Sequence, residues 1–116
     1  ICYLVFLTSW LNATQLDPVI SAIKTRLAAY GDPPVYLSLD IDCLDPAFAP
    51  GTGTPEPGGM SSNQVLTLLE ELVDLPFVGM DCVEVSPPYD HAELSSLAAA
   101  AFVWTYLCGR RLTSGM

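Results

Sequence analysis

The sequence predicts an α/β fold with mostly parallel strands. Helical and strand patterns alternate along the chain, and two apolar runs of strand length each lead into a polar loop. Such alternation is typical of a parallel sheet with helices packed on it. The chain has 116 residues, of which 51% are hydrophobic, so it has room for one domain with a core.

The first predicted helix begins near Asp17. We expect Asp17 as its N-cap, Pro18 as its first helical residue and Gly31 as its C-cap. Two prolines then form a stiff entry to the first buried strand, residues 35–41.

The second half of the chain repeats this order. Ser61 and Gln64 have the spacing of a capping box, which predicts a helix through residue 72. Residues 77–85 form the second buried strand. In parallel sheets, ligands bind beyond the carboxyl ends of the strands, so both following loops are expected at such an edge.

The last predicted helix covers about residues 91–107 and is apolar on more than one face. Asp90 and Glu93 are expected to cap it as a pair. Its large aromatic side chains are all expected in the core: Phe102, Trp104 and Tyr106.

Charge and cysteine usage narrow the function classes. Thirteen acidic residues against four basic ones give a net charge of −9, which disfavours nucleic acid as a partner. This balance suits a cationic substrate or metal ions, or it serves solubility alone. The cysteines have no CxxC spacing, and those at 43, 82 and 108 are expected to be buried free thiols in a reducing compartment.

The first eleven residues are apolar but too short to cross a bilayer as a helix. We interpret them as a buried strand opened by truncation of the chain. The alternative is a processed secretory leader, because a glycosylation sequon begins at Asn12. We leave residues 1–14 as an unplaced apolar segment.

Asp40 and Asp42 stand two apart at the end of the first strand, so strand alternation predicts both carboxylates on one face. Two adjacent carboxylates need a cation between them, which can be a divalent metal, an arginine or a shared proton. Turn capping is the structural alternative. The loop at 42–59 holds four prolines and four glycines, and long irregular loops are usually functional.

Two segments carry a resemblance to a known family. Residues 38–55 read SLDIDCLDPAFAPGTGTP and residues 79–90 read GMDCVEVSPPYD. Both resemble signatures of the ureohydrolases, which include arginase, agmatinase, guanidinobutyrase and formimidoylglutamase. The SPPYD ending is more similar to agmatinases than to arginases. The resemblance covers about residues 35–107 and implies that residues 15–116 are the C-terminal portion of a three-layer α/β/α arginase-like domain with a mostly parallel sheet.

The resemblance also implies the roles of single residues. It implies two Mn²⁺ ions in the parent enzyme, with Asp40 bridging both and Asp42 binding one, and a hydroxide between them as the nucleophile. Glu84 would anchor the guanidinium group of the substrate. Thr54 would support that end of the site, or it is an ordinary turn threonine. Asp45 is expected to form a turn rather than bind metal.

The family pattern is incomplete in this chain. Its upstream histidine and its Asp-x-His-x-Asp segment are absent, and the single histidine, His91, is expected to be structural. No catalytic residue is therefore assigned, and the chain alone is expected to be inactive. The predicted function, in a full-length parent, is hydrolysis of agmatine to putrescine and urea in polyamine biosynthesis. The alternatives are a catalytically incompetent remnant acting as a binding or interaction module, or a sister activity such as guanidinobutyrase.

The expected partners are a small cationic guanidino substrate and further copies of the full-length chain in a homo-oligomer. Neither nucleic acid nor a membrane is expected. The predicted location is the cytoplasm or the mitochondrion, with secretion as the alternative.

Overall fold

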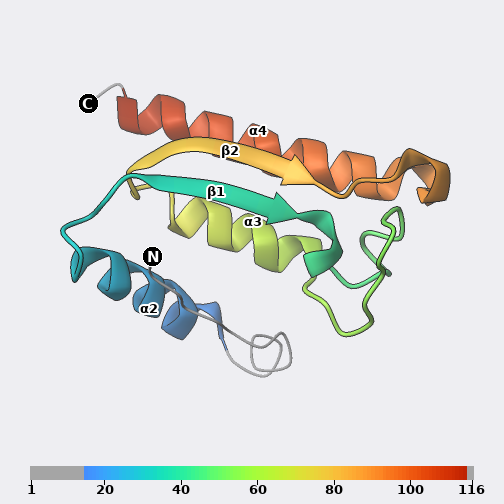
Figure 1. The fold of residues 1–116 in the computed structure, drawn as a ribbon, viewed down its shortest axis with the longest axis horizontal. Helices are drawn as coiled ribbons and strands as arrows, with labels where there is room; N and C mark the ends of the chain where they lie inside the picture. The colour runs from blue at the N-terminus through green and yellow to red at the C-terminus, as the bar shows by residue number, and fades with distance from the viewer. Residues whose placement is uncertain (1–14, 115–116) are drawn as a thin grey trace.

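The computed structural model describes residues 15–114, which form a two-stranded parallel sheet with three helices (Figure 1). The predicted α/β alternation is confirmed. Residues 1–14, interpreted as a strand or leader, lie outside the described part. The elements are α2 (Leu16–Ala28), β1 (Val35–Asp40), η1 (Ile41–Cys43), α3 (Ser62–Glu71), β2 (Phe77–Val83), η2 (Pro87–Tyr89), η3 (His91–Glu93) and α4 (Leu94–Ser114).

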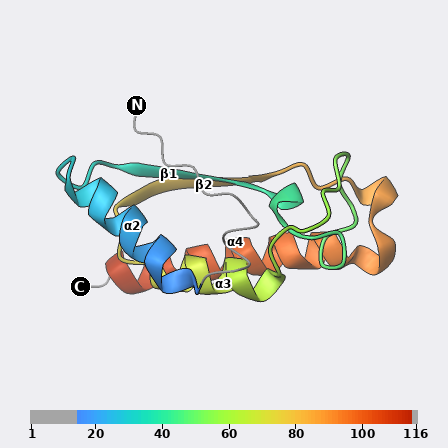
Figure 2. The same ribbon diagram turned by 90° about the horizontal axis from the view of Figure 1, so that it is seen from below.

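The helices all lie on one side of the two strands (Figure 2). The strands pair in parallel, with Leu37 opposite Met80 and Leu39 opposite Cys82 on the face toward the helices. The buried core on this side consists of Leu39, Ile41, Leu44, Ala49, Val65, Leu69 and Phe102. The described residues therefore provide a sheet and one helical layer.

The opposite face of the sheet is polar near its middle. Asp81 accepts hydrogen bonds from the Tyr36 hydroxyl at 3.1 Å and from the Ser38 hydroxyl at 2.7 Å. The bond to Asp81 is the main cause that raises the pKa of Tyr36. The negative carboxylate thus ties the two strands together across this face.

Local sequence patterns predicted the start of one helix correctly and the start of another wrongly. The Ser61–Gln64 capping box is confirmed, with both reciprocal hydrogen bonds present. Helix α2 begins at Leu16 with Gln15 as its N-cap, so Asp17 lies inside the first turn, where its charge favours the helix dipole. The helix ends at Ala28 with Ala29 as its C-cap, so the prediction of Gly31 is wrong by two residues. Gly31 has a φ of 76°, a conformation that favours glycine.

The predicted Asp90–Glu93 cap pair is wrong in its second member. Glu93 has a φ of 60° and lies in the short helix η3, so α4 starts later than predicted, at Leu94. Asp90 instead accepts hydrogen bonds from the backbone N–H groups of Ser95 and Ser96, at 2.8 and 2.9 Å. It satisfies donors that the first turn of a helix leaves free.

Helix α4 does not bury all its aromatic residues. Phe102 is 0% exposed, as predicted, whereas Trp104 is 69% exposed and the prediction for it is wrong. Two residues correspond to roughly 200° around a helix, so Trp104 faces away from the sheet when Phe102 faces it. Tyr106 is half-buried and makes an edge-to-face contact with Phe77, with ring centroids 5.7 Å apart.

The cysteines divide in the same way. Cys43 and Cys82 are half-buried free thiols, while Cys108 is a free thiol on the exposed side of α4, contrary to the prediction. Burial, with the charges of Asp40 and Asp42 adding to it, raises the pKa of Cys43 to about 12. Across residues 15–114, no helix is both long and apolar enough to cross a membrane.

The long loop after β1 is closed at its base. Leu44 and Met60 form a parallel bridge, in which Asp45 N–H donates to the Met60 carbonyl and Met60 N–H donates to the Cys43 carbonyl, both at 2.9 Å. The Asp45 carboxylate accepts from the N–H groups of Ala47 and Gly58, each at 2.8 Å, which also lowers its pKa. The prediction that Asp45 forms a turn is confirmed.

Candidate functional site

Asp40 and Asp42 lie together at the carboxyl end of β1. Asp40 is the last residue of the strand, and Asp42 lies in η1, where its N–H donates to Asp40 Oδ1 at 3.2 Å. The strand ends one residue earlier than predicted. A tight turn, rather than strand alternation, therefore brings the two carboxylates together.

The buried side chain of Ile41 anchors this turn to the core. Its side chain is 0% exposed and belongs to the core, while both flanking aspartates are half-buried. An apolar side chain between two acids thus anchors the backbone, and the carboxylates are held at the surface of the core.

The electrostatics of the site favour a cation. The pKa of Asp40 is raised, first by burial and then by its hydrogen bond with the Asp42 side chain and the negative charges of Asp42 and Glu84, although the Asp42 N–H opposes this. Three acidic side chains therefore act on the same small region. A divalent cation would relieve this repulsion by favouring the charged form of Asp40.

Thr54 returns from the loop to the paired aspartates. Its hydroxyl donates to Asp42 Oδ2 at 2.7 Å. The contact brings the loop back to the strand end and orients one carboxylate. Thr52 nearby in sequence is 3% exposed, and its hydroxyl has no partner within the part of the chain that the structure describes.

Glu84 is the first residue after β2 and has a φ of 65°. This left-handed conformation ends the strand at Val83, two residues before the predicted end. Non-glycine residues in this region store about 1–3 kcal/mol of strain and concentrate at functional sites. The side chain is exposed and its charge acts on Asp40, so the turn leaves the carboxylate free at the same edge as the aspartates.

Gly51 joins the loop after β1 to the loop after β2, a contact that sequence reasoning missed. Its carbonyl accepts from Ser86 N–H at 2.8 Å, and its N–H donates to Ser95 Oγ at 2.7 Å. A Cβ at Gly51 would lie 2.5 Å from the Cβ of Asp90, so this approach needs glycine. Pairing of this kind between residues far apart in sequence has no local pattern.

The remaining candidates do not complete a metal site. His91 is exposed and begins η3. Within residues 15–114, no three His, Cys, Asp or Glu side chains are grouped so that they could hold a metal ion. The functional groups of the site are therefore the carboxylates of Asp40, Asp42 and Glu84 and the hydroxyl of Thr54.

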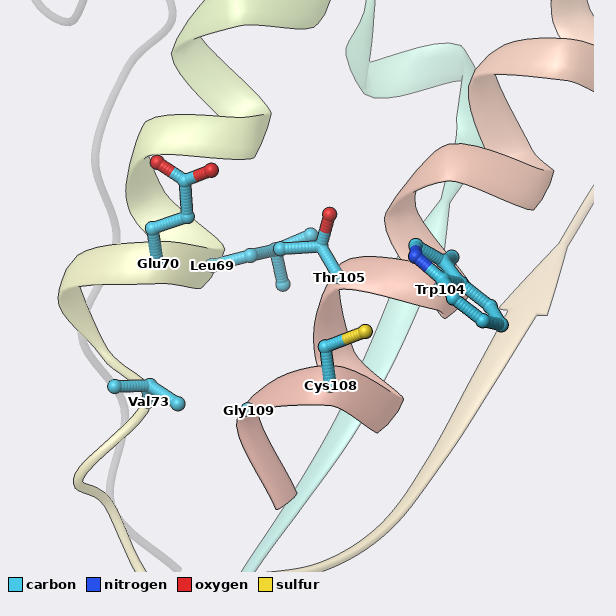
Figure 3. A pocket seen from close by; sticks show the side chains of 7 residues that line it. All are labelled: Leu69, Glu70, Val73, Trp104, Thr105, Cys108 and Gly109. Atoms are coloured by element: carbon cyan, nitrogen blue, oxygen red, sulfur yellow. The ribbon is translucent and has the colours of Figure 1, made fainter. Parts of the chain in front are cut away.

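A groove and a cavity differ in how they lie relative to the acidic site. A groove of about 370 Å³ runs between α3 and the second half of α4 (Figure 3), lined by Leu69, Glu70, Val73, Trp104, Thr105, Cys108 and Gly109. A second cavity, also about 370 Å³, lies between α2, β1 and α3 and is lined mainly by apolar side chains. Only the second reaches the site, through Asp40 and Cys43.

The fold and the site define an α/β protein with paired acidic residues at the carboxyl edge of a parallel sheet. The model of the arginase family matches residues 3–109, and the chain belongs to this family. It is 48% identical over 99 residues to the agmatinase of Chromobacterium violaceum, covering 85% of this chain and 30% of that protein. It is 55% identical over 89 residues to an agmatinase of Escherichia coli, covering 77% of this chain and 28% of the relative.

Solved structures agree with this assignment. A hypothetical agmatinase from Burkholderia thailandensis is similar at 40% identity, with a TM-score of 0.88 over 94% of this chain and 34% of that chain. An arginase from Bacillus subtilis has 34% identity and a TM-score of 0.81 over 89% and 35% of the two chains. The fold is thus arginase-like, and within the arginase family the chain is similar to agmatinases. It spans about 30% of the length of the curated relatives it matches.

Proposed function

We propose that this chain supplies part of the active site of a metal-dependent ureohydrolase that converts agmatine and water to putrescine and urea. One observation carries the proposal: Asp40 and Asp42 meet beside Thr54 and Glu84 at the sheet edge where ligands of such folds bind. The similarity to agmatinases supports the substrate.

The donor set agrees in kind with manganese. Carboxylate oxygens suit Mn²⁺, and the crowding of negative charge that raises the pKa of Asp40 is what a divalent cation would offset. Asp40 and Asp42 would hold the metal, and Thr54 would keep one Asp42 oxygen oriented. Bound metal ions supply charge that polarises the substrate and makes water nucleophilic near neutral pH.

The substrate end of the reaction falls to Glu84. A carboxylate can pair with a guanidinium group through two parallel, charge-assisted hydrogen bonds, which orient its plane. In the hydrolysis, an oxygen of water bonds to the guanidinium carbon, the bond to the alkyl nitrogen breaks, and that nitrogen leaves as a protonated amine. Glu84 would hold the carbon in place for this exchange. The net charge of −9 also favours the approach of a cation.

The experiment is a chimera. The segment of the Chromobacterium violaceum agmatinase that this chain matches is replaced by this chain, and urea release from agmatine is measured with and without Mn²⁺. We expect Mn²⁺-dependent urea from the chimera and loss of most of it in Asp42→Asn and Glu84→Gln. Glu56→Gln, an exposed acid of the same loop, is the matched control and should keep the activity.

The result that would overturn the proposal is a folded chimera that binds Mn²⁺ and releases no urea from any guanidino compound. Urea from 4-guanidinobutyrate but not from agmatine would reassign the substrate to a guanidino acid. The two substrates differ at the end distant from the guanidinium, which is an amine in agmatine and a carboxylate in 4-guanidinobutyrate.

A second candidate function is a binding module without catalysis. It is favoured by the small number of ligands: two carboxylates leave most metal positions to water. Titration of the isolated 116-residue chain with Mn²⁺ separates the two, because tight binding of two ions contradicts the binding-module hypothesis. Weak binding by the isolated chain, together with an active chimera, supports the enzyme hypothesis.

A further inference from the structure

We propose that Ser95 and Asp90, at the start of α4, are positioning residues for the acidic site, acting through Gly51. The proposal rests on the proposed function for its consequence in catalysis. The contacts themselves do not depend on the proposed function, because each of them is present in this structure.

The first step concerns the two backbone hydrogen bonds that hold Gly51, here called the Gly51 seat. Its N–H donates to Ser95 Oγ at 2.7 Å, and Ser95 is 0% exposed, so water cannot replace this acceptor. Its carbonyl accepts from Ser86 N–H at 2.8 Å. Both backbone groups of one buried glycine are thus held by residues of the second loop and α4.

The second step is the rigidity of that seat. Asp90 accepts three hydrogen bonds, from Ser95 N–H at 2.8 Å, Ser96 N–H at 2.9 Å and Ser96 Oγ at 2.7 Å. Its Cα and Cβ lie against Gly51, at 2.7 and 2.5 Å from where a Cβ would stand. Asp90 is therefore fixed to the helix and fills the space beside the glycine.

The third step connects the seat to the acids. Only two residues separate Gly51 from Thr54, whose hydroxyl donates to Asp42 at 2.7 Å. Ser86, the other partner of Gly51, lies two residues after Glu84. One contact point thus sets the placement of both loops, and the carboxylates they carry keep a fixed relation.

The loop has little else to hold it there. Residues 53–58 are all exposed, and a Cβ at Gly53 would meet no atom within 4 Å. The Asp45 carboxylate holds the far side of the loop through Gly58, whereas the side with Thr54 is held by the hydrogen bonds of Gly51 and by burial of Thr52, whose hydroxyl has no partner among the described residues. Loss of the seat is therefore expected to reach Asp42 without opening the core.

The test uses the full 116-residue chain without metal, followed by NMR. In Ser95→Ala we expect the Gly51 amide to exchange about tenfold faster or more, as loss of one buried hydrogen bond implies. We expect the chemical shift of the Asp42 carboxyl carbon to move toward the value it has in Thr54→Val, where the hydroxyl is absent. The amide of Phe102 should keep its protection, because the core is intact. Gly53→Ala is the matched control and should change none of these.

Two results would overturn the proposal. One is an unchanged Asp42 carboxyl signal in Ser95→Ala despite faster exchange at Gly51. The other is a change at Asp42 only together with loss of protection at Phe102, which would indicate a general structural role. If Ser95→Ala does not fold, Asp90→Asn is judged by the same signals. It leaves a single oxygen in place of Oδ1 and Oδ2, so either Ser95 N–H or the two Ser96 donors lose their acceptor.

The chimera then tests the catalytic consequence. In Ser95→Ala we expect about tenfold lower kcat, because the loop that orients the metal ligand loses its anchor at Gly51 N–H. The KM for agmatine should change less than about twofold, because the separate bond from Ser86 N–H to the Gly51 carbonyl, beside Glu84, is not removed. An unchanged kcat would contradict the positioning role. An inactive parent chimera would overturn the proposed function instead, and the NMR signals would still decide the contact chain.

Discussion

Replacing Phe102 by alanine should destabilise the protein more than replacing Trp104, although tryptophan is the larger side chain. Both lie on α4 two residues apart, but Phe102 is 0% exposed and Trp104 is 69% exposed. Replacing a fully buried phenylalanine by alanine costs about 3–5 kcal/mol, because transfer and cavity terms add. Trp104 buries only about a third of a tryptophan surface of roughly 250 Å². At ~25 cal/mol/Å² this burial contributes about 2 kcal/mol. The better helix propensity of alanine returns about 0.5 kcal/mol.

The assay is urea unfolding followed by far-UV circular dichroism, which does not depend on tryptophan fluorescence. Phe102→Ala should lower the free energy of unfolding at least about twice as much as Trp104→Ala, with the urea dependence of both unchanged. If Trp104→Ala costs as much as Phe102→Ala, the inward face of α4 has been assigned wrongly.

Three further predictions concern the loops and titrating groups. Gly59→Ala should cost about 1–3 kcal/mol, because its Cβ would meet the backbone of Leu44 and Asp45. Gly53→Ala should be neutral or stabilising by up to about 1 kcal/mol, and equal urea midpoints for the two variants would refute this. The Asp90 carboxyl should titrate near pH 2 by NMR, since hydrogen bonds from the start of α4 outweigh its desolvation. Its stabilisation is therefore present above about pH 4 and lost as the pH falls toward 2, and Asp90→Asn should remove that part of the acid dependence. Iodoacetamide should label Cys108 well before Cys43, whose pKa of about 12 leaves little thiolate; peptide mass spectrometry showing the reverse order would contradict the structure.

Local sequence signals predicted those features that depend on neighbouring residues. Ser61 and Gln64 cap a helix from three residues apart, and the predicted box is present. The acidic pair at the strand end was also predictable, although a turn and not alternation joins it. The prediction of Asp17 as the N-cap was wrong because Gln15, two residues earlier, has the extended conformation of an N-cap and starts the helix.

The errors arise where distant residues decide. Glu84 ends β2 by turning left-handed, which no propensity at that position indicates. The contact of Gly51 with Asp90 spans loops that are adjacent only after the sheet forms. Trp104 was misplaced because the last helix is apolar on several faces, so periodicity could not select the one that meets the sheet.

The bridge between Leu44 and Met60 has a consequence for how this sequence can vary. It closes the base of the loop independently of the exposed tip at residues 53–58. The entropy of closing a loop rises only slowly with its length, by about 0.6 kcal/mol for each doubling. Insertions near Pro55 or Pro57 should therefore accumulate among homologues at little cost. Insertions between Gly51 and Thr54 should not, because they would lengthen the short tether that reaches the acids.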